Sequence, residues 1–473
     1  MTGAPHETPI WDDAVAQATA IKERVVSSLE LVEAYLDRIN RYDETLRAYV
    51  AVDAAGARRD ARAADELSTR LDPDELPPFH GVTLSVKDVI DVAGLATTHS
   101  CKVLADNVAS RDDPCVTRFR DAGFVILGKT NVPEFCTSMT DSELNGTCRN
   151  PWDTDRTPGG SSGGAAAALA AGLCAVAHGT DGAGSVRSPA AFCGLVGLKP
   201  TRGLIDFGPE IGNLYYGTTE NGVLTRSVRD AAAMLDVLIG ASARTSAQSS
   251  GTAVDTGSTH AFTPLRIAVS TDAPFGTTTP ECADATVEAG RVLEALGHRV
   301  ESATPAWNTI LAAATGPMSV PGAAALIANN DIERVEPRNR PMIRRLAALT
   351  VVEHSRWVEQ VRTAALEFLT FWDTYDVLVT PTAGIVAPSA SWAPWDQDPE
   401  LHMATFMEFP NFAQPFNLSG QPGLSLPLSW NEGGLPIGVH LAGRRLDDAL
   451  LLQIARQLES ATPWAGRHPS GFD

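Results

Sequence analysis

The chain has 473 residues, 44% of them hydrophobic and 20% charged, and its formal net charge is −20 at pH 7. This length is enough to bury a large core, and the negative charge argues against nucleic-acid or anionic-membrane partners, which need a basic surface. No run of about 18 uninterrupted apolar residues predicts a membrane span, and the first residues lack the apolar segment of a secretory signal. The seven cysteines are scattered without a CxxC pair, so we expect free thiols, a cytoplasmic protein and no zinc site.

Residues 10–70 are predicted to be helical. Ser27 and Glu30 have the spacing of a capping box, and Val32 and Leu36 then recur on one helical face. We expect this region to be scaffold that packs on the core.

A strand is predicted around residues 81–88, where Val82, Leu84 and Val86 alternate with small or polar residues. Lys87 follows this run, so its aliphatic stem should be buried. Burial away from a carboxylate lowers the pKa of a lysine, because desolvation disfavours the ammonium form. A buried Lys87 would therefore accept a proton more readily, although a lysine in an unrelated strand is more often an exposed edge residue.

A predicted helix over residues 116–122 leads into residues 123–128, a short apolar run typical of a strand buried on both faces. Residues 129–135 then predict a turn from strand to helix, with Pro133 near the start of the helix. Lys129 lies in that turn, so we expect it to be solvated or ion-paired.

Two glycine-framed serine sites lie within residues 157–202. The first is GGSSGG at 159–164 and the second is GAGS at 182–185, with an alanine-rich, helix-forming segment over 165–171 between them. Glycines beside a serine let the backbone approach closely and direct successive N–H groups at one point, as an oxyanion requires. A serine hydroxyl becomes a good nucleophile only when a neighbouring base takes its proton.

Other interpretations of these two loops fit less well. A Gly/Ser-rich run is often a flexible linker, but this one opens directly into a helix-forming segment. A phosphate-binding loop would end in Lys followed by Ser or Thr, where this chain has alanine. The G-x-S-x-G pattern of α/β-hydrolases fails at Ser185, because Arg187 occupies the last glycine position. Asp181 and Arg187 are predicted to hold the second loop by hydrogen bonds, and His178 to be a packed core residue.

The second half of the chain carries weaker signals. It predicts a helix over 228–239, a linker or insertion over 241–264, a strand over 265–270 and a helix over 283–296. Residues 384–411 predict a long loop with several prolines and six large side chains, namely Trp392, Trp395, Met403, Phe406, Met407 and Phe409. Such a loop either walls a substrate pocket, acts as a lid, or is ordinary packing.

These motifs resemble the amidase signature family. The likeness rests on GGSSGG, GTDGAGSVR, AAFCGLVGLKPTRG and GKTNVPEF, covers most of the chain and is weakest between about 241 and 370. In that family the catalytic trio is Ser–cis-Ser–Lys, so the resemblance implies Ser185 as nucleophile, Ser161 after a cis peptide bond, and Lys87 as base. The implied oxyanion donors are the backbone N–H groups of Gly182, Ala183, Gly184 and Ser185.

The resemblance also implies where a substrate lies. In relatives the backbone just after the GKTNxPEF motif borders the substrate, which here means Cys136, Thr137, Ser138 and Met139. Tyr215 and Tyr216 lie beyond the signature and either line the acyl side of a pocket or belong to the core. Ala183 stands where many relatives have glycine, and it still offers its N–H unless that position needs a positive φ.

The implied fold is α/β, with a mixed, mainly parallel central sheet covered by helices on both faces. We expect one domain over residues 1–473. Its predicted parts are an N-terminal helical region (1–75), the signature core (76–240), the linker or insertion (241–264), a variable helical region (265–370) and the C-terminal part of the core (371–473).

The implied reaction is hydrolysis of the C–N acyl bond of a small apolar or aryl amide through an acyl-enzyme on Ser185, without cofactor or metal. Nylon-type amides and carbamates present the same carbonyl to the same trio, so urethanase activity is included. We expect a monomer or homodimer. Two alternatives are a glutaminase-like subunit of a tRNA-dependent amidotransferase and a non-catalytic binding module, and the presence of the whole trio argues against the second.

Overall fold

A computed structural model describes residues 8–207, 217–243, 263–311 and 331–472. Its strands are β1 (Tyr49–Val52), β2 (Thr83–Lys87), β3 (Val125–Thr130), β4 (Val176–Asp181), β5 (Val196–Lys199), β6 (Glu220–Thr225), β7 (Arg266–Val269), β8 (Arg299–Ser302), β9 (Val377–Pro381), β10 (Gly423–Trp430) and β11 (Pro436–Ala442). Its helices are α1 (Ala14–Lys22), α2 (Ser28–Leu46), α3 (Ala54–Ser68), α4 (Pro114–Asp121), α5 (Gly163–Ala170), α6 (Arg187–Cys193), α8 (Val228–Ala243), α9 (Pro280–Ala295), α10 (Trp307–Leu311), α12 (Arg340–Ala348), α13 (Val351–Leu369), α14 (Pro399–Met407), α15 (Gln414–Ser419) and α16 (Asp448–Ala461).

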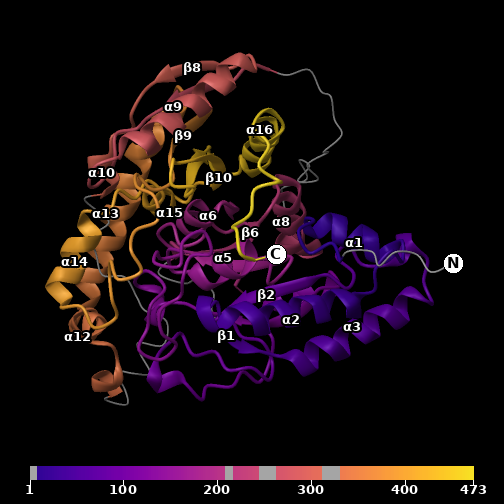
Figure 1. Ribbon diagram of the computed structural model, residues 1–473. Helices are drawn as coiled ribbons and strands as arrows, with labels where there is room; N and C mark the ends of the chain where they lie inside the picture. The colour runs from indigo at the N-terminus through magenta and orange to yellow at the C-terminus, as the bar shows by residue number, and fades with distance from the viewer. Residues whose placement is uncertain (1–7, 208–216, 244–262, 312–330, 473) are drawn as a thin grey trace.

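The strands form one eleven-stranded sheet in the order β1-β3-β2-β4-β6-β5-β10-β11-β9-β7-β8. The expected α/β fold with a mixed sheet is confirmed (Figure 1). The expectation of a mainly parallel sheet is wrong for the described strands, because six of their ten pairings are antiparallel. Residues 431–435 join β10 to β11, and a connection this short reaches only an antiparallel neighbour. In the parallel pairs β2–β3 and β7–β8, the connection between the two strands instead contains a helix, α4 in the first and α9 in the second.

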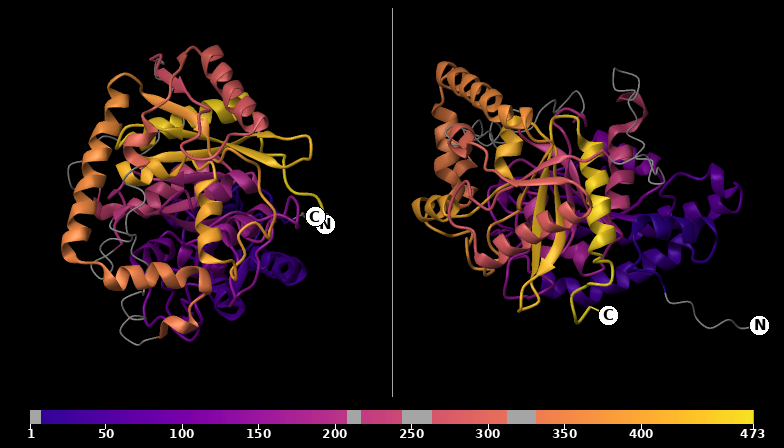
Figure 2. Two further views of the ribbon diagram at one scale, coloured as in Figure 1. Left: turned by 90° about the vertical axis from the view of Figure 1, so that its left-hand side faces the viewer. Right: turned by 90° about the horizontal axis from the view of Figure 1, so that it is seen from above.

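Helices cover both faces of the sheet. The helices α5, α6 and α15 lie on one face beside α10 and α13, and α8, α9 and α16 lie on the other. Glycines allow the closest of these contacts, since a Cβ on Gly438 in β11 would lie 2.3 Å from the Cβ of Ala191 in α6. Figures 1 and 2 place α1–α3 at one end of the molecule and α12–α14 at the opposite end.

The elements expected from the sequence are largely present. The helical region over 10–70 contains α1–α3, with β1 between α2 and α3, and Ser27 Oγ accepts the Glu30 N–H over 3.1 Å in the predicted capping box. The other predicted strands and helices appear as β2, α4, β3, α5, α8, β7 and α9, with ends displaced by a few residues. Most of the predicted linker over 241–264 lies outside the described residues. Within the described ranges, no helix is long and apolar enough to cross a membrane.

The predicted turn after β3 differs from the structure. Lys129 and Thr130 continue the strand, because they pair with β2 on one side and β1 on the other. A single 3-10 turn over Glu134–Cys136 replaces the predicted helix. Its residues Phe135 and Cys136 have φ values of 53° and 64°, which no continuing helix accommodates.

Candidate active site

Lys87 and Ser161 meet in the buried centre of the molecule. Lys87 ends β2, and its Nζ donates to Ser161 Oγ over 2.7 Å and to Thr180 Oγ1 over 2.9 Å. The Lys87 side chain is fully buried, and this burial lowers its pKa, although Cys136 and Asp181 nearby favour the ammonium form. A lysine in this setting can take a proton from the hydroxyl beside it.

Asp88, the next residue in the chain, forms an ion pair with a different lysine, Lys129. Its Oδ1 lies 3.1 Å from Lys129 Nζ, and both side chains are fully buried. Lys129 is therefore ion-paired, one of its two predicted states. No carboxylate of the described residues lies within ion-pair distance of Lys87, so the Lys87 ammonium would lack a direct counter-ion.

Ser161 follows a cis peptide bond from Gly160, as the resemblance implied. Gly160 is tightly packed, since a Cβ there would lie 2.1 Å from the Ser138 carbonyl oxygen. Ser162 donates its N–H to the carbonyl oxygen of Ser185 over 3.1 Å. The two glycine-framed loops are therefore hydrogen-bonded to each other, and they bring the partly exposed Ser185 to the loop that carries Ser161.

The loop before Ser185 leaves several N–H groups available. Those of Gly182, Ala183 and Ser185 have no acceptor within the described part of the chain. The Gly184 N–H instead donates to Asp181 Oδ1 over 2.8 Å. Of the four N–H groups that the resemblance implies as oxyanion donors, that of Gly184 is therefore engaged by a carboxylate, which contradicts its predicted role, and the other three stay predicted donors.

Ala183 is accommodated without strain. Its φ is not positive, whereas that of Gly184 is +104°, a conformation that favours glycine. The Ala183 carbonyl oxygen accepts a hydrogen bond from Asn411 Nδ2 over 2.8 Å, and Asn411 Oδ1 accepts the N–H of Ala413 over 2.9 Å. Asn411 thus ties the loop to the segment that leads into α15.

Asp181 and Arg187 hold this loop, as predicted. Arg187 Nε and Nη2 each donate to a carboxylate oxygen of Asp181 over 2.9 Å, and both side chains are fully buried. Burial alone would raise the pKa of Asp181, but the Arg187 charge and hydrogen bonds hold that pKa well below its usual range. Asn417 completes the cluster, because its Oδ1 accepts from Arg187 Nη2 over 2.6 Å and its Nδ2 donates to Asp181 Oδ1 over 3.0 Å.

The predicted substrate-bordering residues lie against this centre. The Cys136 thiol is close enough to Lys87 to favour its charged form. Ser138 is buried, and its Oγ has no hydrogen-bond partner in the described chain. A buried hydroxyl without a partner costs free energy, so Ser138 is a candidate to bind a group that is supplied from outside the chain.

The segment 384–411 packs beside these residues. Residues 384–398 are irregular, as predicted, whereas α14 occupies part of the remainder. One hydrophobic cluster contains Met139, Phe192, Ala383, Ala387 and Phe409, with Trp392 and Phe406 against it. Met403 and Met407 are instead exposed to solvent. The aromatic residues Trp392, Phe406 and Phe409 thus pack in the same buried cluster as Met139.

The sequence did not predict a role for Thr180, Asn411 or Asn417. Thr180 lies in the GTDGAGSVR motif beside Asp181, and an interpretation of each motif position could have found it. Asn411 and Asn417 are distant from Ala183 and Asp181 in the chain, so only the fold reveals their contacts. His178 is a buried core residue as expected, bonded to Asn221 Oδ1 over 3.0 Å. Tyr215 and Tyr216 lie outside the described residues.

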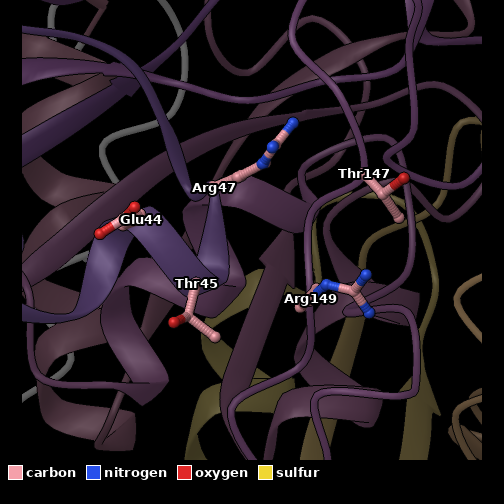
Figure 3. A pocket seen from close by; sticks show the side chains of 5 residues that line it. All are labelled: Glu44, Thr45, Arg47, Thr147 and Arg149. Atoms are coloured by element: carbon pink, nitrogen blue, oxygen red, sulfur yellow. The ribbon is translucent and has the colours of Figure 1, made fainter.

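Two surface cavities lie apart from this centre. A cavity of 310 Å³ is lined by Glu44, Thr45, Arg47, Thr147 and Arg149, and Figure 3 shows that the two guanidinium groups do not meet. A second cavity, of 740 Å³, lies between α9 and the β10–β11 hairpin. Neither is lined by a residue of the predicted trio. In the described residues, no group of three or more His, Cys, Asp or Glu side chains is placed to hold a metal ion.

Comparison with known proteins decides the family. The profile of the Amidase family matches residues 30–452. The chain belongs to the amidase signature family. It is 39% identical to AmiB2, an amidase-family protein of Mycobacterium tuberculosis, and 35% identical to an acylamidase of Rhodococcus erythropolis, each match covering 97% of both chains. The structure of a 6-aminohexanoate cyclic dimer hydrolase complexed with substrate superposes with a TM-score of 0.85, at 34% identity over 98% of this chain and 100% of that one. The present chain is therefore an amide hydrolase.

Proposed function

We propose that the chain is a serine amidase that hydrolyses small apolar or aryl amides through an acyl-enzyme on Ser185. The observation that carries the proposal is the 2.7 Å hydrogen bond between the buried Lys87 Nζ and Ser161 Oγ, on a loop bonded to that of Ser185. A neutral Lys87 takes the Ser161 proton as Ser161 takes the proton of Ser185. Ser185 Oγ, thus activated, attacks the amide carbonyl carbon.

The backbone receives the charge that this attack creates. The carbonyl oxygen gains negative charge as the tetrahedral intermediate forms, and the N–H groups of Gly182, Ala183 and Ser185 are available to it. The C–N bond breaks when the proton returns through Ser161 to the leaving nitrogen. Water then enters, gives its proton to the same relay and attacks the acyl-enzyme, which releases the carboxylic acid and restores Ser185.

Apolar substrates are favoured by the surroundings. Met139 and the aromatic residues of segment 384–411 form an apolar wall beside the site, which suits an alkyl or aryl group. The unpartnered Ser138 hydroxyl adds one polar contact that fits the substrate amide. The likeness to an acylamidase and to a cyclic dimer hydrolase supports linear and nylon-type amides, and carbamates are included because they present the same carbonyl.

The test is release of amine from a panel of purified substrates. The panel contains anilides of increasing acyl length, a 6-aminohexanoate oligomer, an aryl carbamate and glutamine. We expect cleavage of anilides, and the ratio of amide to carbamate rates then defines the substrate class. A folded sample that releases no amine from any of them would contradict the proposal. Glutamine hydrolysis together with co-purification of two partner subunits would favour the amidotransferase alternative.

A further inference from the structure

A buried polar junction links the substrate-bordering loop to the variable part of the chain. Glu134 begins that loop, and its Oε2 accepts from the Glu336 N–H over 3.0 Å and from Asn339 Nδ2 over 2.8 Å. Asn339 Oδ1 in turn accepts from Thr137 Oγ1 over 2.7 Å. Asn339 ends a 3-10 turn over Pro337–Asn339 and is buried, as are Glu134 and Glu336.

Arg338 extends the junction to a third segment. Its Nε donates to Glu336 Oε2 over 2.9 Å, its Nη1 to the Ala393 carbonyl oxygen over 3.1 Å, and its Nη2 to the Asp141 carbonyl oxygen. The Arg338 side chain is fully buried. One guanidinium group therefore fixes the loop that ends at Asp141, the 3-10 turn before α12 and the segment that leads to α14.

The loop that this junction holds contacts the two glycines that precede Ser161. The Ser138 carbonyl oxygen and the Met139 Cα pack against Gly160, leaving no room for a side chain there. Thr140 donates its N–H and its Oγ1 to the Gly159 carbonyl oxygen over 3.0 and 2.9 Å. A displacement of Thr137 is thus transmitted directly to the backbone that carries Ser161.

We propose that Arg338 and Asn339 are positioning residues that hold the wall formed by residues 134–139 and so set the substrate selectivity of the amidase. The proposal rests on the proposed function. Both residues lie in the stretch, about 241–370, where the likeness to the family motifs is weakest. Neither residue contacts Lys87 or Ser161, and their effect acts through the loop.

The hydrogen bond between Thr137 and Asn339 provides the sharpest test. KM and kcat are measured for anilides whose acyl group lengthens and for acetamides whose amine enlarges, with wild type, Thr137→Val, Asn339→Ala and the double variant. We expect each single variant to raise KM for the larger members of one series about fivefold, with a smaller change in kcat. The double variant should show little loss beyond that of Asn339→Ala, because Asn339→Ala already removes the bond to Thr137 together with the bond to Glu134.

Arg344→Ala is the matched control, because Arg344 lies on α12 with an exposed pairing to Glu333. It should keep the wild-type KM and selectivity. Thr137→Val is the milder substitution, and thermal denaturation identifies a variant that fails to fold. Wild-type activity with KM and selectivity unchanged in folded Thr137→Val and Asn339→Ala would overturn the inference. Wild type inactive on every substrate would instead overturn the proposed function.

Discussion

Asp88 Oδ1 lies 3.1 Å from Lys129 Nζ, and this buried ion pair distinguishes Lys129 from Lys87, which has no such partner among the described residues. Lys87 is the last residue of β2 and faces Ser161, whereas Asp88, one residue later, is paired with Lys129. Lys129 has a buried carboxylate as its ion-pair partner, whereas Lys87 has none in the described part of the chain. The arrangement places Lys87, and not Lys129, within hydrogen-bond distance of Ser161.

Removal of Lys129 should therefore affect stability more than chemistry. Lys129→Met leaves the Asp88 carboxylate buried without its partner, which costs about 3–5 kcal/mol of unfolding free energy. Thermal denaturation measures this loss, and the double variant Asp88→Asn/Lys129→Met should recover most of it. A Lys129→Met protein as stable as wild type would show that the pair is not held in the folded state.

The pH dependence of kcat/KM should report Lys87. Burial lowers its pKa from the usual value, and the neutral amine is the active form, so activity should fall as pH decreases through the lowered pKa. Thr180 Oγ1 accepts a hydrogen bond from Nζ and so favours the ammonium form. Thr180→Val should move the acid limb to lower pH. An acid limb at the pKa of an exposed lysine, about 10.4, would contradict this assignment.

Replacement of Arg187 by lysine should reduce kcat. Lysine cannot reproduce the two parallel hydrogen bonds to Asp181, so the loop that carries the N–H donors and Ser185 loses its support. A small misplacement at a reacting centre costs about a hundredfold in rate, and we expect a loss of that order. Arg202→Lys is the control, since Arg202 binds the carbonyl oxygens of Asn417 and Leu418 and not the Asp181 carboxylate. Equal kcat values for the two variants would argue against the role of Arg187.

Ser138→Ala should separate binding from stability. The Ser138 hydroxyl is buried without a partner, so its removal should stabilise the free protein by about 1 kcal/mol. If that hydroxyl binds the substrate amide, KM should at the same time rise about fivefold. Ser28→Ala is the control, because the Ser28 hydroxyl is buried and bonded to the Gly81 carbonyl oxygen over 2.8 Å. Ser28→Ala should lose stability with KM unchanged. A Ser138→Ala variant that behaves in the same way would show that the Ser138 hydroxyl does not bind the substrate.

Local sequence patterns predicted most elements of the fold. The capping box at Ser27 and the apolar run of β3 depend on residues close in the chain, which explains their success. Strand direction was wrong because it depends on which strands become neighbours, and β5, β6 and β10 pair antiparallel in an order that no local pattern encodes. Lys129 was placed in a turn because glycine at 128 suggested the end of the strand.

The candidate site was predicted where its residues stand in compact motifs. Lys87, Ser161 and the loop over 182–185 come from three such motifs, and the structure joins them. The occupied N–H of Gly184 was missed, because the sequence cannot tell which direction an N–H group faces. Asn411 and Asn339 were missed because each reaches the site from a distant segment.

The most direct test of the account is amine release from an aryl amide by wild type, Ser185→Ala and Ser188→Ala. Ser188 lies three residues further on, in the first turn of α6, and its variant is the matched control. We predict that Ser185→Ala loses activity by a factor on the order of 10⁴ or more while remaining folded, and that Ser188→Ala stays active. A Ser185→Ala protein that still releases amine at the wild-type rate would show that another group is the nucleophile.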